Sequence, residues 1–370
     1  MPLLAFYRVT SSSDFAAGAM AGSEFAIGAD AITLSGDEDG TWTGPWVAPG
    51  FAFEEVIPSW NANTPPGSLV QLELQGATPD GVETGWYVLG LWALDDVAFR
   101  RTSLGRQVDE FGSVDTDTFR ATKPLVAYRV RLTLSAAEQG APTVRMVAAI
   151  ASTGANASTS TSLPGVTSGV ELAVPAYAQG SHAGEYPEYD SGGDSWCSPT
   201  STAMVIAYWG VGPSVADYGW VNPGFADPWV DHAARYTFDH GYAGAGNWPF
   251  NTAYAAHFGL DAFVTRLRSL REAEQFVSAG IPLVASIAAE PGQLRGFLLP
   301  NGTAGHLLVI VGFTPEGNPI VNDPAAVSNA TVRRVYDRAQ FEQVWLGGSG
   351  GVVYVISKPG VELPPSPGNW

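Results

Sequence analysis

The chain has 370 residues, 45% of them hydrophobic, and a formal net charge of −18 at pH 7. A chain of this length normally folds into two or three domains, and its apolar content is enough to fill more than one core. The acidic balance, with no run of basic residues, argues against nucleic acid and anionic membranes as partners. No stretch reaches the roughly 18 uninterrupted apolar residues of a membrane-spanning helix.

The sequence does not determine the cellular compartment. Residues 1–8 lack the basic segment and the long apolar core of a signal peptide. The single cysteine, Cys197, excludes a disulfide within the chain, so cysteine content does not distinguish a reducing compartment from an oxidising one. Both a cytoplasmic and a secreted protein are compatible with these features.

Residues 1–152 consist of short apolar runs separated by Gly, Pro, Asp and Thr. The clearest strand patterns lie at 51–57, 69–74, 85–92, 125–134 and 143–151. Between residues 128 and 134, apolar side chains alternate strictly with two arginines and a threonine, which is typical of a strand with one buried face. The pattern predicts an N-terminal all-β sandwich domain of jelly-roll type.

Five tryptophans of this domain lie near its predicted turns: Trp42, Trp46, Trp60, Trp86 and Trp92. Exposed aromatic rings of this kind can stack on sugars, but large aromatic side chains are usually well buried. We therefore expect these rings to fill the core and ends of the sandwich. A carbohydrate contact through this domain is the alternative.

Residues 153–171 are nearly all small or polar, which marks a linker between domains. The following part, 172–358, mixes helices with strands, and a Pro-rich tail occupies 359–370. Helices are expected after Ser269 and Asp337, ending at Gly280 and near Gly347. Strands are expected at 281–287, 307–313, 319–322 and 351–356. The order favours an antiparallel sheet and an α+β fold.

Cys197 stands where one of these helices is expected to begin. Pro199 suits the first helical position, and Gly210 suits the left-handed position just past the helix end. Unpaired backbone N–H groups and the positive end of the helix dipole favour a thiolate at such a helix start. A nucleophile held in this way is what covalent acyl transfer requires.

A cysteine nucleophile also needs a base, and His306 is the candidate among the five histidines because it begins an apolar strand. A tight turn at 316–318 folds the next strand back along the first. This hairpin predicts that Asn322 or Asp323 lies next to His306, where an amide or a carboxylate can accept the imidazole N–H.

The other histidines indicate less. The pairs Asp231–His232 and Asp239–His240 are eight residues apart, which does not place them on one face of a helix, so we expect surface or lid positions. No cysteine accompanies a histidine in a zinc-site pattern. We therefore expect no metal site and no cofactor.

Three blocks together resemble a known family. Cys197-Ser-Pro-Thr-Ser opens an apolar helix ending in Ala-Tyr-Trp-Gly, and Gly-His306-Leu-Leu-Val-Ile-Val-Gly and Val-Asn-Asp323-Pro follow downstream. This order resembles the C39 cysteine peptidase family, in its stand-alone C39-like branch, over about residues 172–358. The resemblance implies a papain-like fold with Cys197 as nucleophile, His306 as general base and Asp323 as the residue that orients the base.

The resemblance also implies an oxyanion hole. The segment Val174-Pro-Ala-Tyr-Ala-Gln179 matches the Val-Pro-x-x-x-Gln lead-in of the family. By this match, the side-chain amide of Gln179 joins the backbone N–H of Cys197 in binding the oxyanion.

The chain departs from the family pattern at two places. Ser198 stands where the family has glycine, which predicts extra bulk beside the nucleophile and a narrower acyl pocket. In addition, 17 residues separate Gln179 from Cys197, more than is usual. This insert contains Glu185, Glu188, Asp190 and Asp194. Its negative charge predicts either repulsion of anionic substrates or binding of a cation.

The favoured hypothesis is a cysteine hydrolase, most simply a peptidase, that cleaves amide bonds with a Cys-His-Asp triad and a Gln/backbone oxyanion hole. The alternative is a carbohydrate- or surface-polymer-binding protein with a catalytically inactive papain-like domain.

Overall fold

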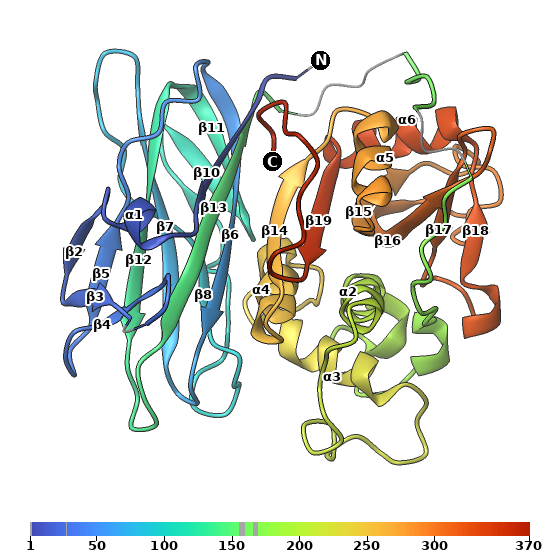
Figure 1. Ribbon diagram of the computed structural model, residues 1–370, viewed down its shortest axis with the longest axis horizontal. Coiled ribbons are helices and arrows are strands. Elements are labelled where there is room, and N and C mark those ends of the chain that lie inside the picture. Colours follow the sequence, from blue (N-terminus) through green and yellow to red (C-terminus); the bar gives the residue numbers. More distant parts are fainter. Residues whose placement is uncertain (1, 27, 155–159, 166–168) are drawn as a thin grey trace. The chain divides into compact units, whose positions relative to one another are not determined.

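The computed structural model describes residues 2–26, 28–154, 160–165 and 169–370 (Figure 1). The described chain forms two compact units. The first contains the described residues from 3 to 154, together with 239–243 and 370, and the second contains residue 2 and the described residues from 160 to 238 and from 244 to 369. Parts of the predicted linker, 155–159 and 166–168, lie outside the described residues.

The first unit is built from antiparallel strands and one short helix, α1 (Ser12–Phe15). The strands are β1 (Leu4–Val9), β2 (Ala19–Ala21), β3 (Ser23–Phe25), β4 (Ile32–Leu34), β5 (Gly40–Thr43), β6 (Phe53–Asn63), β7 (Leu69–Ala77), β8 (Tyr87–Trp92), β9 (Gln107–Val108), β10 (Gly112–Asp115), β11 (Thr118–Leu125), β12 (Ala127–Ser135) and β13 (Thr143–Ser152). One sheet has the order β3-β4-β13-β6-β11-β10-β9, with β1 on β13, and the other has the order β2-β5-β12-β7-β8. The predicted N-terminal all-β region is confirmed.

Strand β12 illustrates how the two sheets share a core. Its apolar residues from Tyr128 to Leu134 are buried, whereas the arginines between them are half-buried, as the alternation predicts. Phe53 on β6 lies edge-on to Tyr128, with ring centroids 5.6 Å apart. Since β6 and β12 belong to different sheets, this aromatic contact packs the two sheets against each other.

The tryptophans of this unit divide into two groups. Trp42, Trp60 and Trp92 are buried, which agrees with the expectation that they fill the core. Trp46 is 38% exposed and Trp86 is half-buried. Both rings face the guanidinium of Arg129, which lies 4.5 Å from the centroid of Trp46 and 5.4 Å from that of Trp86. The expectation of core packing was therefore wrong for Trp46.

The described part of the second unit combines helices with one six-stranded antiparallel sheet. Its helices are η1 (Gln179–His182), η2 (Gly192–Ser195), α2 (Cys197–Tyr208), α3 (Pro228–Thr237), α4 (Trp248–His257), α5 (Leu270–Ser278), η3 (Asn329–Thr331) and α6 (Arg338–Ser349). Its strands are β14 (Asp261–Arg266), β15 (Leu283–Ala289), β16 (Thr303–Phe313), β17 (Pro319–Asn322), β18 (Arg333–Val335) and β19 (Val352–Ser357). They follow the order β14-β19-β15-β16-β17-β18, and every neighbouring pair is antiparallel. The predicted α+β class is confirmed.

Helix ends follow the expected capping chemistry, with one shift. The side chain of Ser269 accepts a hydrogen bond from the third residue of α5, and Asp337 does the same for α6. Gly280 follows α5 in the left-handed region, with φ of +77°. Helix α6 ends at Ser349, and not near Gly347 as predicted, because the chain reaches the left-handed conformation only at Gly350, with φ of +71°.

Helix α2 differs from its predicted form in two respects. It begins at Cys197, so Pro199 is its third residue rather than its first. Its side chains from Ser198 to Ile206 are all buried, whereas the spacings of three and four residues between Met204, Val205, Tyr208 and Trp209 predict a single buried face. The reason is that α2 packs against α3, α4, β15 and β16, which surround it. Gly210 has a φ of +70°, as the predicted helix end requires.

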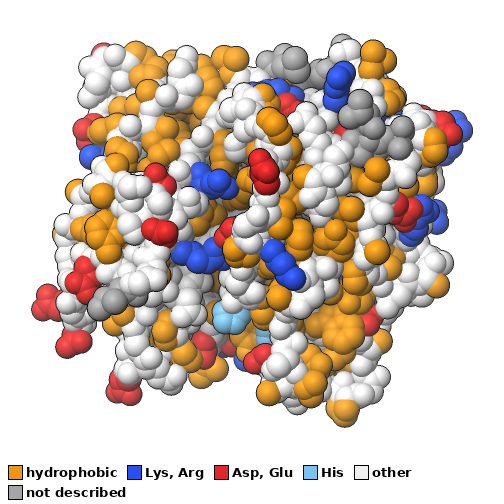
Figure 2. Space-filling view, viewed as in Figure 1, with side chains coloured by type: hydrophobic (Ala, Val, Ile, Leu, Met, Phe, Trp, Pro, Cys, Tyr) orange, Lys and Arg blue, Asp and Glu red, His pale blue; other side chains and the backbone are white. Residues whose placement is uncertain are grey.

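The surface carries few cations. On the face shown in Figure 2, the Lys and Arg side chains stand apart from one another and do not merge into one basic surface. In the part of the chain that the structure describes, no helix has both the length and the apolar character needed to cross a bilayer.

A buried ion pair ties the linker to the second unit. Arg338 is only 6% exposed, and its guanidinium donates to Glu274 Oε1 and to the carbonyl oxygens of Gly317 and Ser162, each at 2.7 Å. Glu342, also buried, accepts from the backbone N–H of Ser162 at 2.7 Å. Since these groups are out of contact with water, each depends on its partners for charge and hydrogen bonding.

We predict that Arg338→Met destabilises the protein by about 3–5 kcal/mol, because it leaves Glu274 buried without its cation. The matched control is Arg333→Met, which removes an Arg–Glu pair with Glu171 whose side chains are 48% and 40% exposed, and this change costs at most about 1 kcal/mol. Urea-induced unfolding measures both free energies. Equal losses for the two variants would contradict a structural role for the buried pair.

Candidate active site

The N-terminus of α2 presents Cys197 with uncapped backbone donors. Cys197 is half-buried and is the first residue of the helix. The residue before it, Trp196, provides no side-chain cap, and Pro199 at the third position has no N–H to donate. The N–H groups of Cys197 and Ser198 are therefore not taken up by a capping side chain, as an oxyanion hole requires.

The hairpin of β16 and β17 places His306 beside Asp323. The Nε2 atom of His306 lies 2.8 Å from Asp323 Oδ1, and both side chains are buried. Because Nε2 is engaged by the carboxylate, Nδ1 is the ring nitrogen left for Cys197, whose side chain interacts with the imidazole and helps to raise the pKa of His306. One helical turn beyond the cysteine, Ser201 Oγ donates to the carbonyl of Leu307 at 3.2 Å, which fixes α2 against the strand that carries His306.

The surroundings of this pair favour an ionised carboxylate and a protonated imidazole. Burial alone would lower the pKa of His306, but the charge and hydrogen bond of Asp323, and the contact with Cys197, raise it to about 10. Burial alone would raise the pKa of Asp323, but His306⁺ and hydrogen bonds from Tyr336 and Ala325 hold it below its ordinary value.

Asn322 does not share this position. Its side-chain amide donates to the carbonyl oxygens of Val174 and Pro175, each at 3.2 Å. Of the two neighbours that the hairpin predicted for His306, the structure thus brings Asp323 to the imidazole. Asn322 holds the segment that leads to Gln179.

Gln179 is buried at the start of η1, and its backbone N–H donates to the carbonyl of Pro324 at 2.8 Å. Its side-chain Nε2 donates to the carbonyl of Asp194 at 2.8 Å, so one N–H of the amide remains for another acceptor. Gly193 lies against this turn so closely that a Cβ there would be 2.3 Å from the Gln179 carbonyl oxygen. The glycine is required for η1 and η2 to pack together.

Ser198 does not narrow the surface beside Cys197. It is fully buried, and its hydroxyl lies 2.9 Å from the Tyr354 hydroxyl on β19. The prediction of extra bulk in the acyl pocket was wrong, because the side chain is accommodated inside the unit.

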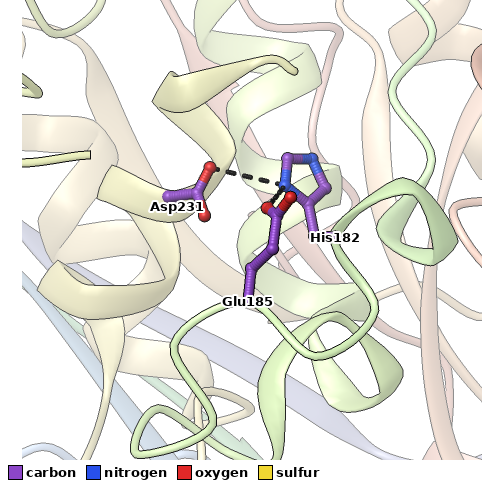
Figure 3. A group of neighbouring side chains, drawn as sticks. All are labelled: His182, Glu185 and Asp231. Atoms are coloured by element: carbon purple, nitrogen blue, oxygen red, sulfur yellow. Dashed lines mark hydrogen bonds and ion pairs between the residues drawn. The ribbon is translucent and has the colours of Figure 1, made fainter. Parts of the chain in front are cut away.

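The acidic insert and α3 bring together three residues that lie far apart in the sequence. His182 and Glu185 from the insert lie against Asp231 on α3, and all three are buried (Figure 3). The expected surface or lid position was wrong for Asp231, and also for His232 and Asp239, which are buried. His232 instead packs inside the unit, with Nδ1 2.7 Å from the Tyr254 hydroxyl. The eight-residue spacing between Asp231–His232 and Asp239–His240 gives no indication of this contact, because the partner of Asp231 is His182, 49 residues earlier in the chain.

A cavity of about 360 Å³ lies along the C-terminal half of α2, between Tyr177, Ile206, Trp229 and Tyr254. Neither Cys197 nor His306 is among its lining residues. It therefore does not by itself define where a substrate binds.

The fold and these side chains define a class: an α+β domain with a cysteine at a helix start and a histidine–aspartate pair on a neighbouring hairpin. Residues 171–351 match the model of the Peptidase_C39 like family, and residues 5–152 match that of the Peptidase C39 N-terminal domain. The chain belongs to the C39-like peptidase family and carries both of these domains. The family resemblance and the two-domain architecture expected from the sequence are confirmed.

No curated protein matches the chain. Among solved structures, the Glycosylation Associate Protein (Gap123) complex from Streptococcus agalactiae is similar at 12% identity over 40% of this chain and 44% of that chain, with a TM-score of 0.22. The Gt strain of infectious bursal disease virus is similar at 13% identity over 40% of this chain and 32% of that chain, with a TM-score of 0.20. The chain thus spans less than half the length of these structures.

The charge pair predicts a pH window of stability. The pKa of His306 rises from 6.5 to about 10 on folding, so its contribution is complete below pH 6.5 and is lost as the pH rises through about 10. The pKa of Asp323 is lowered from 3.8, so its contribution is present above pH 3.8 and is lost as the pH falls through the lowered value. Asp323→Asn should therefore lower the free energy of unfolding most, by about 3 kcal/mol, between pH 3.8 and 6.5. The decrease should become progressively smaller as the pH rises toward 10.

Urea-induced unfolding at several pH values measures this difference. The matched control is Glu316→Gln, an exposed carboxylate in the turn of the same hairpin, whose effect should be small at every pH. A cost of Asp323→Asn that does not change between neutral and alkaline pH would refute the charge pair.

Proposed function

We propose that this protein is a cysteine hydrolase that cleaves peptide bonds, with Cys197 as nucleophile, His306 as general base and Asp323 as the residue that orients the imidazole. The observation that carries the proposal is the buried His306–Asp323 pair at 2.8 Å, with the Cys197 side chain interacting with the same ring. Membership of the C39-like peptidase family supports it independently.

The chemistry follows from the arrangement. His306 holds the proton of the Cys197 thiol as an imidazolium, and the thiolate attacks the carbonyl carbon of an amide. The N–H of Cys197 and the amide of Gln179 stabilise the negative charge on the carbonyl oxygen. The imidazolium then donates its proton to the leaving amine, and water releases the acyl group from the sulfur.

The insert adds a substrate preference to the proposal. Glu188 and Asp194 are exposed, and the carbonyl of Asp194 accepts a hydrogen bond from Gln179, so negative charge lies near the proposed oxyanion hole. We infer that neutral or basic peptides are better substrates than acidic ones.

We do not extend the proposal to carbohydrate binding by the N-terminal domain. Of the five tryptophans considered, Trp46 and Trp86 are the two that are not buried, and Arg129 lies over both rings. These aromatic faces are therefore already in contact with a guanidinium group.

A mixture of internally quenched peptides tests the reaction. The full chain should cleave members of the mixture, and Cys197→Ala and His306→Ala should each abolish cleavage. Gln179→Ala should lower kcat by about 10²–10³-fold, the usual cost of losing one oxyanion donor. The control is Gln340→Ala on α6, a half-buried glutamine outside the proposed site. Full cleavage by Cys197→Ala would overturn the proposal.

Thiol labelling tests the pairing of Cys197 with His306 without a known substrate. Iodoacetamide at about pH 6 should label Cys197 faster than a free thiol, because the imidazolium stabilises the thiolate. The His306→Ala variant should react much more slowly, whereas His257→Ala should react like the natural chain. A rate in the natural chain no greater than that of a free thiol would remove the main chemical support for the nucleophile.

A further inference from the structure

Three buried side chains outside the proposed active site converge on one point (Figure 3). His182 is fully buried at the end of η1, Glu185 is 9% exposed and Asp231 on α3 is 1% exposed. The Nδ1 atom of His182 lies 2.7 Å from Glu185 Oε2 and 3.4 Å from Asp231 Oδ2. One nitrogen and two carboxylates therefore meet, with all their ligand atoms within 4.8 Å of one another.

The charges of this cluster do not balance. One ring nitrogen carries at most one proton, so it cannot donate to both carboxylates. Both carboxylate oxygens of Asp231 are buried without a hydrogen bond, and so is Nε2 of His182. Even with a protonated imidazole, two carboxylates and one imidazolium leave one negative charge. Burying such a charge without a partner is costly, so the cluster needs either a further proton, which burial favours by raising the pKa of Glu185, or a bound cation.

The donor set indicates which cation fits. An imidazole nitrogen with two carboxylate oxygens suits Zn²⁺ and related transition metals, whereas Ca²⁺ and Mg²⁺ prefer oxygen ligands alone. Ligand atoms in a tetrahedral zinc site lie about 3.4 Å apart, at metal distances of about 2.0–2.2 Å. The 3.4 Å between His182 and Asp231 already has this value, whereas His182 and Glu185, now 2.7 Å apart, would have to separate by about 0.7 Å.

We propose that His182, Glu185 and Asp231 bind one divalent transition-metal ion, with Zn²⁺ as the reference metal. This inference does not depend on the proposed peptidase activity. It departs from the expectation that the chain has no metal site, and it develops the cation-binding alternative that the sequence raised for the acidic insert.

The position of the cluster indicates what the ion does. His182 closes the turn that Gln179 opens, and its ring lies 5.8 Å from the ring of Trp196, the residue before Cys197. Since Asp231 belongs to α3, an ion bound here fastens the insert to that helix. The role is structural: the ion holds the segments on both sides of the insert, which end in Gln179 and Cys197.

The binding test uses the full chain with Cys197→Ser, so that the proposed Cys–His site cannot bind the metal. After removal of metals with a chelator, titration calorimetry should find about one Zn²⁺ per chain, and Zn²⁺ should raise Tm while Ca²⁺ and Mg²⁺ leave it unchanged. Asp231→Asn and Glu185→Gln should each weaken Zn²⁺ binding at least about 10-fold. Glu188→Gln, an exposed carboxylate of the same insert, should bind Zn²⁺ unchanged.

Two isosteric variants keep the test decisive if one of them does not fold. Absence of stoichiometric Zn²⁺ binding would overturn the proposal, and so would binding that survives in both Asp231→Asn and Glu185→Gln. Binding seen in the natural chain but lost with Cys197→Ser would assign the metal to the thiol instead, and would also refute it. Thiol labelling and peptide cleavage test Cys197 and His306, whereas the Zn²⁺ titration tests Asp231 and Glu185. A protein that cleaves no peptide can therefore still bind Zn²⁺ as proposed, and the two failures are distinguishable.

Discussion

The hairpin of β16 and β17 is the constraint on which the rest of the candidate site depends, because each part of the site is hydrogen-bonded to it. It carries the His306–Asp323 pair, and the carbonyl of Leu307 holds α2 through Ser201. Asn322 holds the lead-in segment, and the carbonyl of Pro324 holds the backbone of Gln179. The nucleophile, its base and the proposed oxyanion donor are thus anchored to this hairpin and to the two residues that follow it, and rigid support of this kind is what catalysis requires.

Much of this arrangement could be predicted from local sequence. The alternation in β12, the caps at Ser269 and Asp337 and the tight turn after β16 each report on neighbours within a few residues, where spacing determines which side chains meet. The hairpin could even restrict the partner of His306 to two adjacent residues. The choice between them depended on the lead-in segment, nearly 150 residues away, which occupies Asn322 and leaves Asp323 to the imidazole.

Contacts between distant segments explain what the sequence could not predict. The sequence pattern predicts an amphipathic helix for α2, but the side chains from Ser198 to Ile206 are all buried. The periodicity of its apolar residues therefore says little about which side of the helix faces the core. Ser198 reads as an obstruction beside the thiol, but a hydroxyl on β19 gives it a place in the interior. Asp231 reads as a surface residue because its partner belongs to a different part of the chain. In each case tertiary packing overrides the local pattern.

The described part of the second unit contains two buried imidazole–carboxylate groups, and their difference separates the two roles proposed for them. Asp323 faces one imidazole, and its remaining hydrogen-bonding capacity is used by the Tyr336 hydroxyl at 2.7 Å and the Ala325 N–H at 3.0 Å. That pair is satisfied and electrically balanced, so it can hold a proton at a fixed place. The group around His182 has two carboxylates for one imidazole, and both oxygens of Asp231 lack a hydrogen bond. An arrangement that is short of positive charge in this way is suited to holding a cation rather than to transferring a proton.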